Sequence, residues 1–577
     1  MFILRSLVGL CLALACSSSV RAQQYSISTL AGNGSSGFSG DGGAANAAQL
    51  ALPGRIALDS SGNLYIADSA NHRIRMVSNA GTITTIAGTG TSGFSGDGKA
   101  ASSAQLASPT GIAVDKSGNV YIADSVNNVV REITSGNINT IAGSNSAGPG
   151  YSGDTASATA AQLYNPVAVA VDSSGNVFIA DANNSVIRKV SAGIITTVVG
   201  GIATPFTQLI HPDGLALDAA GNLYIADTGN RRILKFSGGV VTQVAGSGNL
   251  GFSGDNGPAT NAALNDSTGV AVDPAGNIYI ADTFNNRIRR ISPTGIITTI
   301  AGNGRASYVG DGGSAVSASL NFPHDMVIDG AGNIYVADTS NSTIRLLKPQ
   351  APSISAGGVV NAATFSAAIS PGALASVFGA NFAGGKGGPG LPLPSNFANL
   401  SVSVNGVAAP ILFVTPTQVN FQVPWETKVG SANISINNGL TSNTVSVPVL
   451  NAAPGLFVQS SGQAIVQNSD FSLNTPGNPA TEGLPIVAYL TGSGPVDPPV
   501  ANGVAAPVIP LAKLTSAYSA TIGGSAAQVA FAGLAPGFVG LVQMNIVVPT
   551  GLPKGNYPLS VTIHGEMSNS GTVSVTP

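Results

Sequence analysis

Short runs of β-branched and aromatic residues alternate with Gly, Asn and Asp along residues 25–348. In the segments GIAVD, NVYIAD and NVVREI, for example, a few apolar residues are followed at once by turn-forming residues. Segments of this length and composition are typical of strands joined by hairpin turns, whereas an amphipathic helix shows a longer apolar period. The pattern predicts an all-β fold built from four-stranded antiparallel sheets.

One such unit recurs six times, and each copy ends its second strand with an Asp. Another Asp lies nine residues before this marker, the Asn of a Gly-Asn pair lies five before it, and a further Asn lies three after it. Asp and Asn at fixed offsets around Gly are turn formers, so we assign them to turns and not to a site. Sheets that are apolar on both faces are covered by radial packing, which predicts a β-propeller of six blades. The markers are Asp68, Asp124, Asp181, Asp227, Asp282 and Asp338.

The repeat region has one incomplete unit and one unassigned strand. The last unit has only three strands, MVID, NIYVAD and TIRLLK. The chain before the first unit holds YSISTLAG, which matches the outer-strand segment ITTIAG. We expect residues 25–31 to supply the outer strand of the sixth blade, which removes a free sheet edge.

The repeated pattern P-x-G-[IL]-A-[VL]-D, G-N-[LVI]-Y-[IV]-A-D and N-x-[RI]-[IV]-[RL] resembles the NHL-repeat family over residues 25–348. The resemblance implies a six-bladed NHL β-propeller spanning residues 23–348. Propellers of this family mostly present one face to proteins or polymers, and the fold alone does not fix the ligand.

Five of the six connections between blades are long loops with the sequence GFSGDG or a variant of it. In each loop an aromatic residue is followed three residues later by Asp. Such pairs could stack on sugars or contribute to a Ca²⁺ site. The alternative is that each ring packs on its own loop and each Asp caps the short helical turn that follows. These rim pairs are Phe38 and Asp41, Phe94 and Asp97, Tyr151 and Asp154, Phe252 and Asp255, and Tyr308 and Asp311.

The propeller region contains twenty Asp and a single Glu, Glu132. Seventeen of these Asp occupy the repeat positions, so the other three are departures from the repeat. These three and two His lie where the innermost strands of blades four to six begin, and an Arg occupies the corresponding place in blade one. Such a cluster is a candidate ligand or metal site, and turn residues satisfied by the backbone are the alternative. The cluster consists of His211, Asp213, Asp266, His324, Asp325 and Arg55.

The string FPHDMVID in the last unit also resembles one blade of the peptidyl-amidoglycolate lyases, which are zinc-dependent propellers. This resemblance implies that His324 is a metal ligand. Asp325 and Asp213, from the same cluster, are further metal candidates. A catalytic zinc water needs three protein ligands, but the equivalent positions in other blades include Thr110 and Thr268. We therefore assign no catalytic residue and expect no cofactor, with Ca²⁺ or Zn²⁺ as the alternative.

Composition narrows the class of protein further. Only 8% of the 577 residues are charged, the net charge is -3 and 44% are hydrophobic. A disordered chain would combine high charge with low hydrophobicity. A nucleic-acid binder would carry a basic surface. A helical protein is disfavoured by 74 Gly.

After Lys348 the repeat ends, and residues 349–355 read as a linker. Two similar halves follow, each with alternating apolar and polar residues between turn signals. They predict two immunoglobulin-like β-sandwiches, residues 356–450 and 451–577. The strings VNGVAAPILFVTPTQVNFQVPWE and FAGLAPGFVGLVQMNIVVP resemble the Solibacter-type C-terminal domain found behind propellers in secreted bacterial proteins, a family without an assigned activity.

Residues 1–22 read as a secretory signal peptide, with Arg5, an apolar stretch and a small-residue cleavage site at Ala22. A lipoprotein leader acylated at Cys16 is the alternative. Both cysteines lie within this leader, so we expect an exported chain without disulfides. No later apolar run is long enough for a transmembrane segment in the mature chain.

These observations predict a secreted bacterial protein in the periplasm, at the cell surface or outside the cell. Its expected function is non-catalytic: one face of the propeller binds a ligand or partner, either an extracellular protein or a polysaccharide and not a nucleic acid. Two alternatives stay open. One is a metal-dependent lyase or hydrolase at the mouth of the channel, and the other is a carbohydrate-binding protein.

Overall fold

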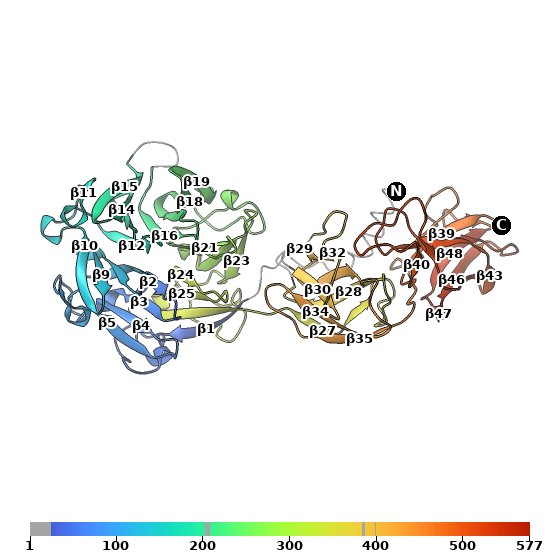
Figure 1. The fold of residues 1–577 in the computed structure, drawn as a ribbon, viewed down its shortest axis with the longest axis horizontal. Coiled ribbons are helices and arrows are strands. Elements are labelled where there is room, and N and C mark those ends of the chain that lie inside the picture. The colour runs from blue at the N-terminus through green and yellow to red at the C-terminus, as the bar shows by residue number, and fades with distance from the viewer. Residues whose placement is uncertain (1–24, 202–207, 383–386, 398–399) are drawn as a thin grey trace. The chain divides into compact units, whose positions relative to one another are not determined.

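The computed structural model describes residues 25–201, 208–382, 387–397 and 400–577. The predicted signal peptide, residues 1–22, lies outside this range. The chain divides into two compact units, one containing residues 24–349 and the other residues 350–577 (Figure 1). The described residues form an all-β fold, as predicted, because their helices are short 3-10 turns. None of these helices has the length and apolar character needed to cross a bilayer.

The first unit contains six antiparallel sheets, which we call blades one to six in chain order. The first strands of neighbouring blades contact one another in a closed ring, in the order β2, β7, β12, β16, β20, β24 and back to β2. The sheets therefore surround a common axis, as in a propeller. Blade one contains β2 (Pro53–Leu58), β3 (Leu64–Asp68), β4 (Arg73–Val77) and β5 (Ile83–Ala87).

The next three blades repeat this order, and two of them carry an additional two-residue strand. Blade two contains β6 (Lys99–Ala100), β7 (Pro109–Val114), β8 (Val120–Asp124), β9 (Val129–Thr134) and β10 (Asn137–Ala142). Blade three contains β11 (Ala156–Ser157), β12 (Pro166–Val171), β13 (Val177–Asp181), β14 (Val186–Ser191) and β15 (Ile194–Gly200). Blade four contains β16 (Pro212–Leu217), β17 (Leu223–Asp227), β18 (Arg232–Ser237) and β19 (Val240–Ala245).

Blade five contains β20 (Gly269–Val272), β21 (Ile278–Asp282), β22 (Arg287–Ile291) and β23 (Ile297–Ala301). Blade six is assembled from both ends of the unit, because β24 (Pro323–Ile328), β25 (Ile334–Asp338) and β26 (Thr343–Pro349) are completed by β1 (Tyr25–Ala31). Tyr25 pairs with Pro349 and Thr29 pairs with Arg345 in antiparallel register. The orphan strand identified in the sequence therefore forms the outer edge of the last sheet.

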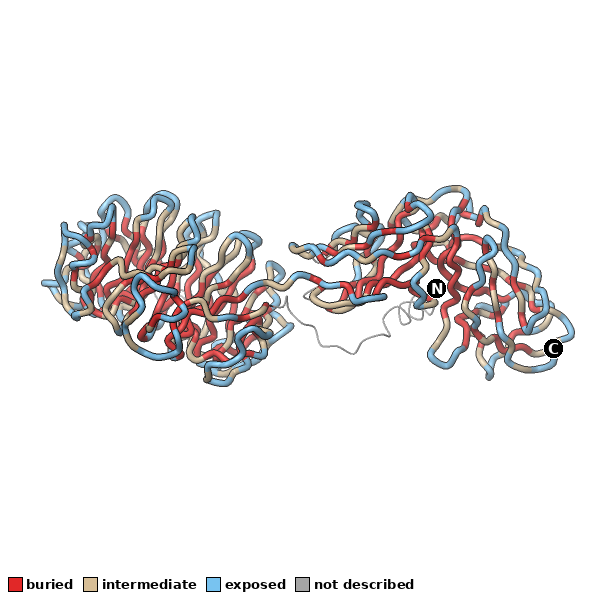
Figure 2. The backbone as a smooth tube through the Cα atoms, turned by 90° about the horizontal axis from the view of Figure 1, so that it is seen from below, coloured by how far each residue is buried: buried red, intermediate tan, exposed pale blue. Residues whose placement is uncertain are grey.

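Apolar side chains from neighbouring blades pack into continuous cores between the sheets, and Figure 2 shows the strands buried and the connecting turns exposed. The repeated Asp and Asn residues form the turns, as predicted. Asp68 accepts a hydrogen bond from the backbone N–H of Ala51 at 2.7 Å and another from Asn71 at 2.8 Å. The short 3-10 turn that follows ends at a residue with left-handed backbone, His72 in blade one.

The same 3-10 turn joins the second and third strands in all six blades. It is η2 (Ser69–Asn71), η4 (Ser125–Asn127), η7 (Ala182–Asn184), η8 (Thr228–Asn230), η10 (Thr283–Asn285) and η11 (Thr339–Asn341). The remaining 3-10 turns are η1 (Ala45–Ala47), η3 (Ala101–Ser103), η5 (Asn145–Ala147), η6 (Ala158–Ala160) and η9 (Ala259–Asn261).

The second unit holds two pairs of sheets, and each pair encloses its own core. The first core runs from Ile354 to Val449 and the second from Ala452 to Val575. The immunoglobulin-like assignment stays a prediction. The first pair contains β27 (Ser353–Asn361), β28 (Leu374–Ala380), β29 (Asn396–Phe397), β30 (Leu400–Val404), β31 (Val407–Ala409), β32 (Ile411–Val414), β33 (Gln418–Gln422), β34 (Gly430–Asn437) and β35 (Val445–Val449).

The second pair of sheets contains more strands, several of them only two residues long. They are β36 (Gly455–Leu456), β37 (Val466–Gln467), β38 (Ala480–Thr481), β39 (Pro485–Thr491), β40 (Val496–Asp497), β41 (Lys513–Leu514), β42 (Tyr518–Ile522), β43 (Ser525–Ala527), β44 (Val529–Leu534), β45 (Val542–Val547), β46 (Gly555–Ile563), β47 (Glu566–Met567) and β48 (Gly571–Thr576).

Candidate functional site

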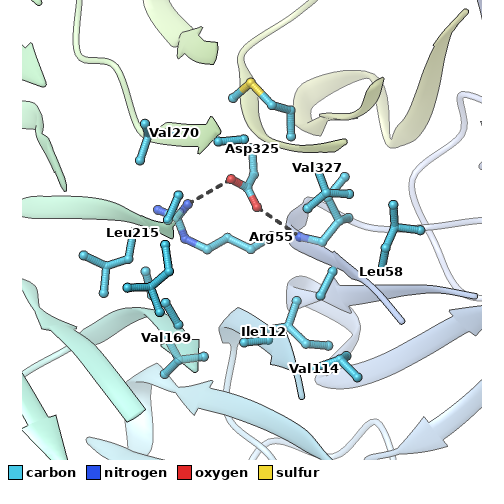
Figure 3. Close-up of a pocket in the computed structure, with 18 of the residues that line it drawn as sticks. Arg55, Leu58, Ile112, Val114, Val169, Leu215, Val270, Asp325 and Val327 are labelled. Carbon is cyan, nitrogen blue, oxygen red and sulfur yellow. Dashed lines mark hydrogen bonds and ion pairs between the residues drawn. The ribbon is translucent and has the colours of Figure 1, made fainter. Parts of the chain in front are cut away.

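The face at which the six first strands begin, which we call the mouth face, carries an Arg at its centre (Figure 3). Arg55 extends from β2 toward the axis, and its side chain is almost fully buried. Its Nη1 donates to Asp325 Oδ1 at 3.3 Å, and the backbone N–H of Ile56 donates to the other carboxylate oxygen at 3.2 Å. Blades one and six are joined by this ion pair.

The same guanidinium also reaches three further blades. Its Nε donates to the carbonyl oxygen of Val167 at 3.1 Å, and Nη2 donates to the carbonyl oxygens of Asp213 at 2.6 Å and Thr268 at 3.0 Å. Arg55 is therefore hydrogen-bonded to blades three, four, five and six at once. It closes the mouth end of the channel.

Space for this side chain exists because the position equivalent to Arg55 is small in four blades, where it holds Gly111, Ala168, Gly214 and Gly269. A Cβ atom on Gly214 would lie 2.5 Å from the carbonyl oxygen of Thr268, which is a steric clash. The neighbouring backbones thus approach too closely for a larger residue. Only blades one and six place a long or polar side chain at this level.

His211 and Asp213 form a second pair at the mouth, with Nδ1 and Oδ1 3.2 Å apart. The hydrogen bond that the His211 imidazole donates to Asp213 raises the pKa of His211 above its usual value. Burial alone would raise the pKa of Asp213, but His211, Arg55 and His324 together lower it. The pair is an ionised carboxylate that orients an imidazole, and half of the imidazole is exposed to solvent.

His324 lies in β24 and differs from His211 in its surroundings. Burial and the adjacent Arg55 charge lower the pKa of His324 to about 4, so the ring is neutral near pH 7. Its Nδ1 is buried and has no hydrogen-bond partner among the described residues. Burial raises the pKa of the neighbouring Asp325, and the Arg55 charge opposes that rise.

Asp266 does not join this cluster. It lies in a turn three residues before β20, with left-handed backbone at φ 45°, and not at the start of the strand as expected. Its carboxylate faces Arg231, 3.9 Å away. Asp266 occupies the same repeat position as His211, but the pairing of the first strand in blade five begins only at Gly269.

The metal candidates His324, Asp325 and Asp213 do not form a metal-binding group. Within the described ranges, no three His, Cys, Asp or Glu side chains lie close enough together to hold one ion. The carboxylate of Asp325 is directed to Arg55, and that of Asp213 to His211.

The five rim pairs all contact a buried Arg in the third strand of their blade. In blade two, Arg131 lies between the repeat Asp124 at 3.5 Å and the rim Asp97 at 2.6 Å, and its guanidinium carbon is 4.9 Å from the centroid of the Phe94 ring. Each such Arg side chain is fully buried. The arginines are Arg75, Arg131, Arg188, Arg289 and Arg345, and we call each of them with its two Asp and its ring an arginine clamp.

The clamps correct one expectation about the rim loops. The rim Asp residues bind Arg, whereas the 3-10 turns after the loops have no side-chain cap at their N-termini. Blade four has neither the loop sequence nor the Arg, and Leu234 takes the place of the Arg. The loop sequence and the Arg are thus missing from the same blade, and this correlation in the sequence could have indicated that the two interact.

Beyond Arg55 the channel continues toward the other face as a cavity of about 300 Å³. The first strands of all six blades line it, with aliphatic residues such as Leu58, Val114, Leu215 and Val270 (Figure 3). Arg55 and Asp325 at its closed end are its charged lining residues.

Around the mouth each blade places one large apolar side chain at the surface, exposed in blades one to five and partly buried in blade six. The turn before the first strand and the 3-10 turn of the same blade lie together, since the backbone N–H of Phe284 donates to Asn265 and that of Val126 to Ala107. The apolar residue comes from a different one of these positions in different blades. The set, which we call the apolar ring, is Leu52, Val126, Tyr164, Ile210, Phe284 and Phe322.

Five members of the apolar ring are exposed, and Phe322 is partly buried. Leu52, Val126 and Phe284 have half or more of their surface accessible. Phe284 and Phe322 bridge blades five and six in an edge-to-face contact, with ring centroids 4.7 Å apart. The sequence analysis did not identify this ring, because its members occupy no single repeat position.

Comparison with known proteins agrees with this architecture. Residues 53–307 match the family described as "SMP-30/Gluconolactonase/LRE-like region", and residues 320–345 match the NHL repeat. This region is an NHL/SMP-30-like propeller. The match to the SMP-30 family covers less than half of the chain, and it does not extend into the second unit.

Relatives of the NHL/SMP-30-like propeller occur in much longer proteins. It is 32% identical over 325 residues to protein SUPPRESSOR OF QUENCHING 1 of Arabidopsis thaliana, 52% of this chain and 30% of that protein. It is 29% identical over 323 residues to NHL repeat-containing protein 2 of Bos taurus, 51% of this chain and 38% of the relative. Teneurin-4 of Homo sapiens is 28% identical over 323 residues, 51% of this chain and 10% of that protein.

Among solved structures, a protein of unknown function from Bacteroides thetaiotaomicron aligns with a TM-score of 0.43 at 21% identity, covering 56% of this chain and 76% of the other. A gluconolactonase from Xanthomonas campestris aligns with a TM-score of 0.37 at 15% identity, and the alignment covers 59% of this chain and 92% of the gluconolactonase.

Proposed function

We propose that the chain is a secreted, non-catalytic binding protein whose NHL/SMP-30-like propeller docks an extracellular protein on its mouth face. The apolar ring is the observation that carries this proposal. Monomeric proteins rarely expose contiguous apolar surface without an interaction that covers it. Aromatic anchors such as Tyr164 are also common among the hot spots of protein interfaces.

The positions of the ring residues support a binding role over a folding role. A residue needed for the propeller fold recurs at the same repeat position in each blade, as Asp68 and its equivalents do. The ring residues instead come from three different positions, and they converge only on the surface. A shared surface is therefore the property that these side chains have in common.

The charges inside the ring favour a partner without strong charge. His211 is paired with Asp213, Arg55 with Asp325, and Arg231 lies near Asp266. Paired charges give little long-range attraction for a polyanion, whose binding depends on unpaired Lys and Arg. An uncharged, apolar protein surface complements this face best.

A polysaccharide partner at the rim loops is a weaker proposal. A sugar ring stacks on a free aromatic face, whereas the ring of Phe38 is covered by Arg73 and Arg75, and that of Phe252 by Arg287 and Arg289. The rim carboxylates are likewise engaged with Arg side chains.

A metal-dependent lyase or hydrolase at the mouth is the second candidate function, and the His211–Asp213 pair favours it. A carboxylate that orients a partly exposed imidazole is a common arrangement for a general base. Ca²⁺ or Zn²⁺ would be the metal. Purified protein that lacks a stoichiometric divalent ion, and whose metal content is unchanged in His324→Ala, would contradict this candidate.

Crosslinking tests whether a protein docks on the mouth face. Phe284 is replaced with a photo-reactive amino acid, and the protein is crosslinked to extracellular material from its source. We expect one crosslinked protein that is lost when Tyr164→Ser and Ile210→Ser are added. Val240 is the matched control position, because it is equally exposed but lies on the outer strand β19 of blade four. Equal crosslinking from positions 284 and 240, or crosslinking that survives the two Ser substitutions, would contradict the proposal.

The extracellular location rests on the leader sequence at residues 1–22 and stays part of the proposal. We further propose that residues 350–577 space or attach the propeller. Export would be supported by a mature N-terminus near Gln23 in protein recovered from the medium or periplasm.

A further inference from the structure

The axis of the propeller at the mouth face is lined by oxygen atoms that converge on one place. The first strand of each blade is a sheet edge, so its carbonyl groups on the axial side have no strand to pair with. Those of Val167, Asp213 and Thr268, together with Oδ1 of Asp325, all lie within 3.3 Å of nitrogen atoms of a single guanidinium. Their lone pairs and the carboxylate give this place a negative potential.

Backbone carbonyl and carboxylate oxygens are the ligands that Ca²⁺ and other hard cations take. Side chains from the neighbouring strands reach few of these oxygens, because Gly111, Gly214 and Gly269 occupy positions beside them. The exception is Thr110, whose Oγ1 donates to the carbonyl oxygen of Val167 at 3.2 Å. At Gly269, a Cβ would lie 2.8 Å from the carbonyl oxygen of His324 and 3.0 Å from Oδ1 of Asp325. The carbonyl oxygens of Asp213 and Thr268 are reached along the axis instead, by the guanidinium of Arg55.

We infer that the axis is a cation site that the protein fills with its own Arg55 in place of a metal ion. Arginine suits this task because its guanidinium stays charged at every physiological pH and offers five N–H donors in one plane. The donors reach four blades beyond the one that carries them. This inference goes beyond the proposed function, since it concerns what holds the centre of the binding face.

The test replaces Arg55 with Gly, the residue at the equivalent position of three other blades. Without the guanidinium, the full chain should melt several degrees lower, because Asp325 is left buried and unpaired. Low-millimolar Ca²⁺ or guanidinium should raise the melting temperature of Arg55→Gly and leave that of the wild type unchanged. Tb³⁺, a luminescent probe for Ca²⁺ sites, should bind Arg55→Gly at one ion per chain and the wild type not at all.

Two further variants test the role of the Asp325 carboxylate and of the planar donor set of Arg55. In Arg55→Gly combined with Asp325→Asn, the Tb³⁺ signal should fall at least tenfold, since one carboxylate ligand is lost. Arg55→Lys keeps the charge but not the planar donor set, so its melting temperature should be intermediate and should not respond to Ca²⁺. Sodium at equal ionic strength controls for screening.

The inference would be overturned if Arg55→Gly melted like the wild type, or if Tb³⁺ bound both proteins alike. It would also be overturned if Arg55→Gly stayed unfolded in the presence of both Ca²⁺ and guanidinium, because a cation on the axis should then suffice. None of these outcomes depends on a binding partner, so they are independent of the crosslinking experiment.

Discussion

The guanidinium of Arg75 lies over the ring of Phe38, with its central carbon 4.8 Å from the ring centroid, and the same relationship recurs in five of the six blades. The Arg is fully buried, while the ring and the rim Asp are partly exposed. The rim loops therefore act as covers that desolvate an ion pair between the loop and the blade. Their aromatic and acidic residues are explained by this structural task.

Removal of a clamp Arg should destabilise the propeller strongly. Arg131→Leu, which introduces the residue found at Leu234 in blade four, leaves Asp124 buried without its cation. Breaking one partner of a buried ion pair costs about 3–5 kcal/mol. Urea unfolding followed by circular dichroism measures the change. Asp124→Asn added to Arg131→Leu should recover part of the loss, and a loss no larger than that of an exposed-site variant would contradict the clamp.

The aromatic residue of the clamp should matter for stability and not for sugar binding. Phe252 covers Arg287 at 3.8 Å and Arg289 at 4.7 Å, so Phe252→Ala should lower the free energy of unfolding by about 1–2 kcal/mol. Thermal melting tests the first part. The opposite result would favour carbohydrate binding at the rim loops. In that case the wild type binds on a glycan array, and Phe252→Ala abolishes the binding without a change in melting temperature.

His324 should make the protein acid-sensitive. The pKa of His324 is about 4 in the folded protein and 6.5 in its ordinary state, so the unfolded chain binds more protons between these pH values. Stability from this group is therefore complete above pH 6.5 and is lost as the pH falls toward 4, by up to about 3 kcal/mol.

The variant His324→Thr tests this pH dependence, since Thr occupies the equivalent position at Thr110 and Thr268. Its free energy of unfolding should change less between pH 7 and pH 4 than that of the wild type. Arg55 and Asp213 are the charged groups that act on His324, and both remain in the variant. Identical pH profiles for the two proteins would show that His324 does not carry the effect.

The N-terminal strand should be required for a stable propeller. Deletion of residues 23–32 removes β1, which pairs with β26 in antiparallel register. It also removes an isolated bridge between Ser26 and Ser314. The remaining blade six would expose β26 as a free edge, so the melting temperature should fall and aggregation should increase. A truncated chain with the thermal stability of the intact protein would contradict this role.

Sequence reasoning located the strands, the turns and the outer strand of blade six, because these depend on local patterns that repeat. Asp68 and Asn71 were assigned to turns on spacing alone, and their hydrogen bonds agree. His211, Asp213, Arg55 and Asp325 were grouped in one cluster because they depart from the repeat, and both ion pairs lie within that cluster.

What the sequence did not reveal depends on contacts between segments far apart in the chain. Arg55 meets Asp325 across 270 residues, and nothing near either residue indicates the pairing. Asp266 was placed at a strand start, but strand pairing in blade five begins only at Gly269, which the repeat pattern does not show. The apolar ring stayed hidden because its members share a surface and not a repeat position.

The pairing of Tyr25 with Pro349 also sets the timing of folding. The first strand to be synthesised has its partner at the far end of the propeller, so it must wait, unpaired, until the last blade has emerged. Closing so long a segment carries a large entropic cost and slows the final step. The propeller thus gains its full resistance to unfolding only when all six blades have been made. In a chain interrupted before β26, the first and last blades stay unconnected.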